Sequence, residues 1–402
     1  MIRSRGIVGV LLPTCLAIIL LAGACAAQST PEPSSPPRSS PLGPPPLAPL
    51  TSRDVASSYD VGLEPAVRDS STRAALLIAP IPFYNSQLGA GAVGVAGALK
   101  VLGHEATTPP SFAGLLGLAT TNGSWGVGLG TRLHLDEDAW RLLGGGGWFD
   151  IRYSFYGVGQ RQDQSITLRQ TMSPLLAEGL RRVAPSFYLG LRTQYNRVQI
   201  RVDTDSLPPE LVPYIVQPEP YTEVIVAPRF QVDTRNDQMY PTHGWLIDAT
   251  ASYLSSAFGS DSTMHNYTGL VTYQHGWSED KNVIAAACQV CASAGEVPID
   301  QLCIVGAING LRGYEPGRYM DRSQLTVQAE YRRSFGRFGV TGFTGAAQTA
   351  RTLGELDTNG ILFAGGVGLR YRLLRRFPIN YRVDTAFGKD GTQIYFSLGE
   401  AF

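Results

Sequence analysis

Apolar and polar residues alternate one by one along most of this chain, and this alternation restricts the possible folds more than any other feature of the sequence. In the run QLTVQAEYR, apolar Leu325, Val327, Ala329 and Tyr331 alternate with polar Thr326, Gln328, Glu330 and Arg332. Successive side chains of a β-strand point to opposite faces, so the run predicts a strand with one apolar and one polar face. Similar runs occupy 220–234 and 378–388. We therefore expect an all-β fold.

Sixteen such runs follow one another between turn signals. They span 72–84, 88–101, 112–121, 124–135, 138–155, 164–181, 185–201, 220–233, 244–257, 264–278, 281–293, 322–334, 338–349, 359–373, 378–388 and 391–402. A soluble half-buried sheet alternates too, but a spanning barrel has a polar lumen, an apolar outer face and an even number of strands. The sequence predicts a 16-stranded antiparallel transmembrane β-barrel over 71–402.

The lengths of the connections suggest an orientation. If the first strand runs outward, the long connections at 202–219 and 294–321 lie outside the cell. The tight turns at 182–184, 279–280 and 335–337 then lie in the periplasm. Long outer loops and short inner turns are typical of such barrels.

The composition excludes two other classes of protein. Charged residues make up 16% of the 402 residues and the formal net charge is zero. The charged share is below the roughly 25% of a soluble domain, and no basic surface is available for nucleic acid. After the N-terminus no stretch of about 20 apolar residues occurs, which excludes a helical membrane protein.

The first residues read as an export signal. Arg3 and Arg5 precede an apolar run over 7–21 and small residues over 22–27. We therefore predict a signal peptide over residues 1–26 and location in the bacterial outer membrane. Cleavage before Cys25 would expose that cysteine for lipidation, whereas cleavage after the small residues that follow it would leave no lipid. Both sites remain open.

Residues 27–70 are expected to form a disordered periplasmic tether. Their centre, PPRSSPLGPPPLAPL, is dense in proline and serine. Such a segment cannot bury enough apolar surface to fold, and it behaves as a semi-extended linker.

The longest polar connection contains Gly310-Leu311-Arg312-Gly313-Tyr314. Glycines on both sides of the leucine and arginine allow a tight turn that pushes one guanidinium forward. The simplest interpretation of this pentapeptide is a surface turn with a solvated arginine. A long loop between two short strands, however, usually has a function.

Several motifs together resemble the bacterial surface antigen family, the BamA- and TamA-type outer-membrane barrels. They are LRGYEPGRYMDR followed by QLTVQAEYR, then PRFQVDTRNDQMYPTHGW, YSFYGVG and IYFSLGEAF. The matching structural positions are Asp233, Thr234, Arg235, Pro241, Gly244, Trp245 and Phe402. Transport members of this family carry periplasmic POTRA domains, and the tether is too short to replace one, so we expect a member without them.

The resemblance assigns a role to the long loop. It corresponds to the sixth outer loop, which folds into the barrel lumen and places its arginine against acidic residues of the wall. The loop–lumen motif is thus Leu311, Arg312, Gly313, Tyr314 and Glu330. One family acid is replaced by Gly345, so we expect Arg312 to pair with Glu330, helped by Asp321 or Asp384.

The C-terminal strand is expected to place Ile394, Phe396, Leu398 and Phe402 on the lipid face, with Glu400 among them near the headgroups. An apolar strand that ends on an aromatic residue resembles the signal read by the barrel-assembly machinery. That machinery and the outer-membrane lipids are the partners the resemblance implies.

Three cysteines lie beyond the signal. Cys291 ends a strand at the outer rim and Cys303 lies in the next loop, so in an oxidising compartment we expect them to form a disulfide and to leave Cys288 aside. The spacing Cys288-x-x-Cys291 also suggests a metal site, but no second pair or histidine follows at ligand spacing. We expect neither metal nor cofactor.

No catalytic pattern was found. The chain has no Gly-x-Ser-x-Gly motif, and its five histidines are scattered. We predict a non-enzymatic accessory of protein translocation or assembly with an unidentified periplasmic or secreted protein partner. The alternatives are a passive pore or structural anchor for a soluble partner, and an outer-membrane hydrolase.

Overall fold

The structure is a computed structural model of the whole chain. It describes residues 75–402 apart from 86–87, 105–107, 160–164, 204–218, 239, 307–309 and 373–379. The expected signal peptide over 1–26, the lipidation candidate Cys25 and the tether over 27–70 lie outside the described residues.

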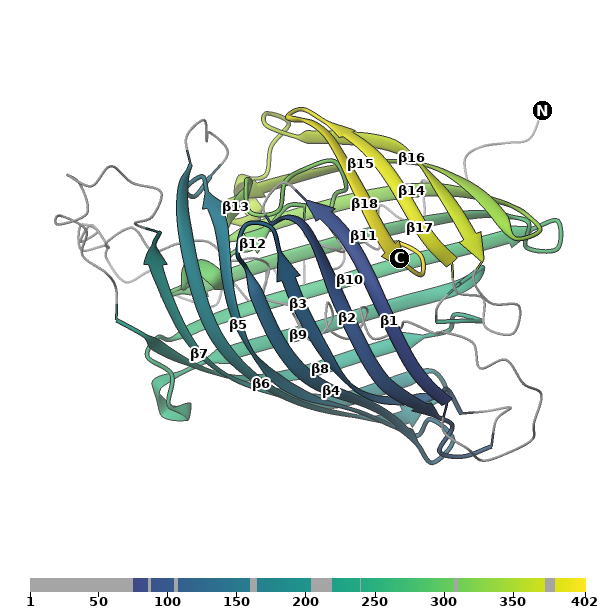
Figure 1. The fold of residues 1–402 in the computed structure, drawn as a ribbon, viewed down its shortest axis with the longest axis horizontal. Coiled ribbons are helices and arrows are strands. Elements are labelled where there is room, and N and C mark those ends of the chain that lie inside the picture. Colours follow the sequence, from purple (N-terminus) through teal and green to yellow (C-terminus); the bar gives the residue numbers. More distant parts are fainter. Residues whose placement is uncertain are drawn as a thin grey trace.

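Sixteen antiparallel strands form one sheet in which hydrogen-bonded neighbours follow the chain order (Figure 1). These strands are β1 (Ala75–Asn85), β2 (Gly89–Lys100), β3 (Ser111–Thr120), β4 (Trp125–Leu135), β5 (Trp140–Phe155), β6 (Ile166–Ala184), β7 (Phe187–Val202), β8 (Tyr221–Asp233), β9 (His243–Leu254), β10 (Met264–Trp277), β11 (Asn282–Gly295), β14 (Ser323–Phe335), β15 (Phe338–Ala350), β16 (Leu362–Arg372), β17 (Asn380–Gly388) and β18 (Gly391–Leu398). The all-β class and the sixteen strands are confirmed.

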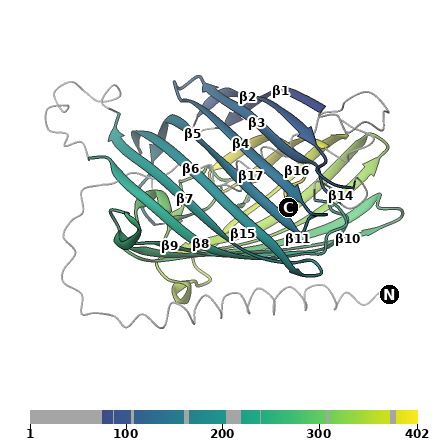
Figure 2. The same ribbon diagram turned by 90° about the horizontal axis from the view of Figure 1, so that it is seen from below.

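The sheet is strongly curved (Figure 2), and its first and last strands, β1 and β18, lie side by side (Figure 1). The convex face of the curved sheet is turned outward, and we call the concave face the enclosed face. The described helices are the 3-10 turns η3 (Ser256–Phe258), η4 (Ile299–Gln301) and η5 (Leu353–Glu355). No helix among the described residues is long and apolar enough to cross a membrane.

The two faces carry the residues that the alternation predicts. In β14, Val327 and Tyr331 are exposed on the outer face, while Gln328, Glu330 and Arg332 are buried on the enclosed face. Other strands repeat this pattern, with outward Leu129, Trp148, Leu175, Leu191, Phe363 and Leu369. An outer face of this kind suits hydrocarbon, because apolar side chains cover it.

The enclosed face also holds apolar clusters beneath the long loop between β11 and β14. In the larger one, Ile304 and Met320 of the loop pack against inward residues of β5, β6 and β7, among them Ile151, Leu168 and Ile200. In the second, Leu311, Tyr314 and Tyr319 pack with Ala347, Leu362 and Ala364. The loop is therefore packed against two parts of the wall.

The structure adds one element and corrects one expectation. The long loop contains a short antiparallel ladder of β12 (Cys303–Ile304) and β13 (Met320–Asp321). The last strand stops at Leu398, because Gly399 adopts a positive φ of 77° and breaks the alternation. Glu400 consequently lies on the enclosed face, where its side chain is buried beside Arg370 and Asn380, rather than near the lipid headgroups.

Candidate functional site

The loop arginine lies in the middle of a buried charge cluster. We call this cluster the anchor network, and its members are Arg312, Glu330, Arg332, Arg370, Arg382, Asp384 and Glu400. Strand β14 supplies Glu330 and Arg332, β16 supplies Arg370, and β17 supplies Arg382 and Asp384. Each points inward because of its place in the alternation of its strand.

Arg312 bridges two strands that are far apart in the sequence. Its Nη2 lies 2.6 Å from Glu330 Oε2 and its Nη1 lies 2.7 Å from Asp384 Oδ2. The guanidinium also stacks on the ring of Phe343, 3.5 Å from the centroid. Only 5% of the Arg312 side chain is exposed, so both ion pairs are largely withdrawn from water.

The acids of the network are shared with the wall arginines. Arg332 Nε lies 2.7 Å from Glu330 Oε1, and Arg370 lies 2.5 Å from Asp384 and 2.8 Å from Glu400. Removing one member of a buried ion pair typically costs about 3–5 kcal/mol, because the other charge stays buried without compensation. Every member of the network therefore helps to keep the others in place.

Residues next to Arg312 fix the loop backbone. The Gly313 amide donates to Tyr395 Oη at 2.9 Å, and Gln328 Nε2 donates to the Gly310 carbonyl at 3.0 Å. Tyr314 Oη donates to the carbonyl of Phe363 at 2.8 Å. Gly313 has a φ of 108°, a value that L side chains rarely adopt, so glycine is required at this turn.

Gly345 stands where the resemblance implied an acid, and a loop side chain, Leu311, lies beside it. A Cβ at Gly345 would lie 2.7 Å from Leu311 Cδ1 and 2.8 Å from Gln328 Cγ. Leu311 is 1% exposed and occupies the space that a side chain would need. Asp384 supplies the second acid instead, whereas Asp321 accepts a hydrogen bond from the Arg322 amide and does not reach Arg312.

A disulfide between Cys291 and Cys303 joins the end of β11 to the loop. Cys288 is buried and lies outside this bond.

The 3-10 turn η4 attaches the loop to β8. Asp300 of η4 accepts a hydrogen bond from Tyr221 Oη of β8 at 2.8 Å, and Gln301 Nε2 donates to both oxygens of Glu223 at 3.2 Å. Burial, the largest cause, raises the pKa of Asp300 to about 6.

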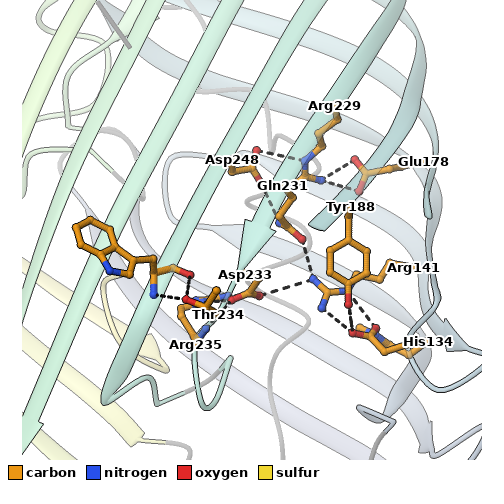
Figure 3. A network of polar contacts seen from close by, with 12 residues as sticks. His134, Arg141, Glu178, Tyr188, Arg229, Gln231, Asp233, Thr234, Arg235 and Asp248 are labelled. Atoms are coloured by element: carbon orange, nitrogen blue, oxygen red, sulfur yellow. Dashed lines mark hydrogen bonds and ion pairs between the residues drawn. The ribbon is translucent and has the colours of Figure 1, made fainter. Parts of the chain in front are cut away.

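The motif around the β8–β9 turn forms a second structural unit. The amide of Trp245 donates to Thr234 Oγ1 at 2.9 Å, and Arg235 Nε donates to Asp233 Oδ1 at 2.9 Å (Figure 3). Gly244 has a φ of 108°, and a Cβ there would collide with the Thr234 carbonyl. The carbonyl of Pro241 accepts a hydrogen bond from Arg332 at 3.3 Å, which connects this turn to the anchor network.

Sequence reasoning missed a polar chain that runs from this turn along the enclosed face (Figure 3). Asp138, in the β4–β5 turn, lies 2.7 Å from His134 and 2.6 Å from Arg141 and accepts from Tyr188 Oη at 2.8 Å. Burial opposes ionisation, yet the hydrogen bonds from His134 and Arg141 hold the pKa of Asp138 below its usual value. The spacing His134-x3-Asp138-x2-Arg141 was a signal that alternation alone could not interpret.

The same chain continues through β6, β8 and β9. Arg141 Nη1 donates to Gln231 at 2.7 Å, and Gln231 donates to Asp248 at 2.9 Å. Arg229 then joins Asp248 to Glu178 through contacts of 2.5 and 2.6 Å. These contacts cross-link the strands on the enclosed face.

The buried pair of His134 and Asp138 lies next to a serine, Ser111. Ser111 Oγ, however, bonds to the backbone amide and carbonyl of His134, while the His134 ring contacts Asp138. Among the described residues, no group of three His, Cys, Asp or Glu residues is arranged to hold a metal ion. The geometry is that of an anchored loop.

Comparison with known proteins identifies the family. Residues 138–402 match the model of the Omp85 superfamily domain. The chain belongs to the Omp85 superfamily. It is therefore an outer-membrane β-barrel of a family whose barrels are generally not enzymes.

Two solved structures share the fold of this Omp85 barrel. BamA from Haemophilus ducreyi lacking POTRA domains 1–3 superposes with a TM-score of 0.53 at 16% identity, covering 86% of this chain and 76% of that chain. CdiB from Acinetobacter baumannii superposes with a TM-score of 0.52 at 10% identity, covering 81% of this chain and 59% of that chain. A search of curated protein sequences found no match.

Proposed function

We propose that this Omp85 protein is a closed outer-membrane barrel whose loop between β11 and β14 is held inside the lumen, and that it acts as an accessory of protein translocation or assembly. The observation that carries the proposal is the bridge from Arg312 to Glu330 and Asp384. A surface turn with a solvated arginine would not need two buried acids. Closure occurs between β1 and β18, which already lie side by side.

The packing of the loop favours this role over that of a passive pore. The loop contacts the wall through Ile304 and Met320 near one set of strands and through Leu311 and Tyr314 near another. A segment packed in this way occupies much of the lumen. We therefore expect little steady conductance, whereas a passive pore or a simple anchor barrel has no use for an occluding loop.

The proposal includes the route to the membrane and the partners. Residues 1–26 direct export, residues 27–70 form the periplasmic tether, and the barrel-assembly machinery inserts the chain by its last strand. Outer-membrane lipids surround the barrel, and a periplasmic or secreted protein is its client. We expect no nucleic acid among its partners.

Two measurements test the role. In planar bilayers, the purified barrel should conduct little, and Arg312→Ala should raise the conductance because the loop loses its anchor. In the producing bacterium, deletion of the gene should remove specific outer-membrane or secreted proteins from the corresponding fractions. A large steady conductance of the native barrel together with unchanged protein fractions would favour the passive pore.

A further inference from the structure

The anchor network holds one arginine, Arg382 of β17, that has no acid of its own among the described residues. Arg312 and Arg370 each contact a second carboxylate besides Asp384, at 2.6 and 2.8 Å. Arg382 pairs with Asp384 alone, and its Nε lies 3.6 Å from Oδ2, which is too far for a hydrogen bond. Asp384 already accepts hydrogen bonds from Arg312 Nη1 and Arg370 Nη1. One carboxylate is thus shared by three guanidiniums, and Arg382 has the weakest hold on it.

The guanidinium of Arg382 also carries buried donors that no described residue accepts. These donors are its Nε and Nη1, and only 7% of the side chain is exposed. Arg312 Nε and Arg370 Nη2 are likewise buried without an acceptor in the described part of the chain. Buried polar groups of native proteins nearly always have a hydrogen-bond partner. The donors therefore indicate an acceptor that is bound from outside the chain.

The strand register increases the need for a negative charge at this place. Arg382 of β17 stands directly opposite Arg370 of β16. Like charges opposite each other on adjacent strands destabilise a sheet. Both side chains are buried on the enclosed face, with 6% and 4% exposed, so water screens them little. An anion beside the two guanidiniums would remove this repulsion.

The surroundings limit the size and the charge of the anion. The side chains of Asp384 and Glu330 are completely buried beside the arginines, and they would repel an ion with more than one negative charge. The wall is also close, because a Cβ at Gly368 would collide with Asp384 Oδ1. A compact ion with a single charge satisfies both limits better than phosphate or sulfate does.

We propose that Arg382, together with Arg370 and Arg312, binds a halide ion on the enclosed face of the barrel, which is chloride in ordinary solutions. The ion accepts hydrogen bonds from Arg382 Nε and Nη1 and supplies the charge that Asp384 cannot give to three arginines at once. Because Arg312 belongs to the loop, halide binding and loop docking stabilise each other. The inference rests on the docked loop of the proposed function and not on a role in translocation or assembly.

Crystals of the full-length barrel soaked in sodium bromide test the site directly, because bromide scatters X-rays anomalously. We expect an anomalous peak within hydrogen-bond distance of Arg382 Nε or Nη1. Crystals of Arg382→Met should show no peak there. Native crystals without a peak beside Arg382 would overturn the proposal, whatever the conductance of the barrel and the protein fractions of a deletion strain show.

The stability of the folded barrel in a neutral detergent gives a second measurement. Replacing gluconate, which is too large for the site, by chloride at constant ionic strength should raise the temperature at which the unboiled band is lost by about 2–4 °C. Arg382→Met should abolish this rise. In gluconate this variant should be at least as stable as the native barrel, because it no longer buries a poorly paired charge. Arg382→Gln replaces it if it does not fold.

Arg351→Met is the matched control, since Arg351 is an exposed arginine in the connection between β15 and β16. We expect it to keep the native response to chloride. Equal temperatures in chloride and gluconate for the native barrel would exclude a halide site. A native response in Arg382→Met would place the chloride elsewhere. If acetate matched the effect of chloride and no bromide peak appeared, the acceptor would be a carboxylate, such as one from a bound protein, and not a halide.

Discussion

At the scale of single residues, the site depends on how one buried guanidinium is neutralised. Arg312 meets two acids and an aromatic ring, and each acid is also held by a wall arginine. Charges withdrawn from water are stable only when their pairing is complete. Substitutions here should therefore affect more than the contact that they remove.

Arg312→Ala and Glu330→Gln should each destabilise loop docking by about 3–5 kcal/mol, because each leaves buried charge without its partner. The double variant should cost less than the sum of the two single variants, because both single variants lose the same Arg312–Glu330 contact. Protease sensitivity of the outer loop and the yield of the unboiled band measure the effect. Arg337→Ala, an exposed turn residue, is the control, and fully additive losses would show that the pair does not act as a unit.

Gly345→Ala should destabilise the protein by about 1–3 kcal/mol, the usual range for overpacking. The new methyl group would lie 2.7 Å from Leu311 Cδ1 and from the Val327 carbonyl oxygen, and 2.8 Å from Gln328 Cγ. Gly342→Ala lies on the same strand, where a Cβ meets nothing within 4 Å, and should be neutral. Urea midpoints in detergent compare the two variants. Equal midpoints would mean that Leu311 and the neighbouring β14 backbone can make room for a side chain at position 345.

At the scale of elements, the loop between β11 and β14 is attached at several separate places. A disulfide joins it to β11, η4 contacts β8, and Arg312 reaches β14 and β17. These attachments differ in chemistry, so reduction, pH and mutation should release different parts of the loop.

Alkylation before and after reduction should differ by two thiols, those of Cys291 and Cys303. Cys303→Ser should leave the barrel folded but make residues near η4 more sensitive to added protease, because one attachment of the loop is lost. Mass spectrometry of the labelled peptides identifies the thiols. Labelling of Cys291 and Cys303 in the unreduced folded protein would exclude the bond.

Docking of η4 should weaken as the pH rises. The pKa of Asp300 is raised from about 4 to about 6, so the docked loop binds this proton more tightly than the released loop. Docking is then strongest below about pH 4 and declines until about pH 6. Hydrogen exchange around η4, corrected for the intrinsic pH dependence, measures this. Asp300→Asn should reduce the dependence, and an unchanged slope in that variant would assign it to the neighbouring Glu223.

At the scale of the whole molecule, the curved sheet of sixteen strands carries polar networks on its enclosed face, while apolar side chains cover the outer face. The chain of contacts from Asp138 through Arg141, Gln231 and Asp248 to Glu178 cross-links strands that are not neighbours in the sheet. Such internal links resist unfolding from either end.

The mature protein should therefore fractionate with the outer membrane and migrate differently before and after boiling. A closed barrel resists detergent until heat separates its strands, because every strand has hydrogen-bonded neighbours. Gel migration without boiling measures this directly. Recovery in the soluble periplasm with unchanged migration would contradict the barrel.

Sequence reasoning located the strands well because its evidence is local. A period of two shows in a few consecutive residues which side chains share a face, and β14 follows it without exception from Gln324 to Arg332. The pairing of Arg312 with Glu330 followed from that alternation together with the family resemblance. The polar chain through His134 and Asp138 was missed, because its members come from five separate segments.

The sequence by itself determined the strands, their two faces and the glycine-framed loop, since each depends on residues close together in the chain. Only the tertiary structure decided that Asp384, 72 residues from Arg312, supplies the second acid and that Leu311 fills the space beside Gly345. It also turned Glu400 into the enclosed face. These contacts follow from strand register and the curvature of the sheet, which no local pattern of residues records.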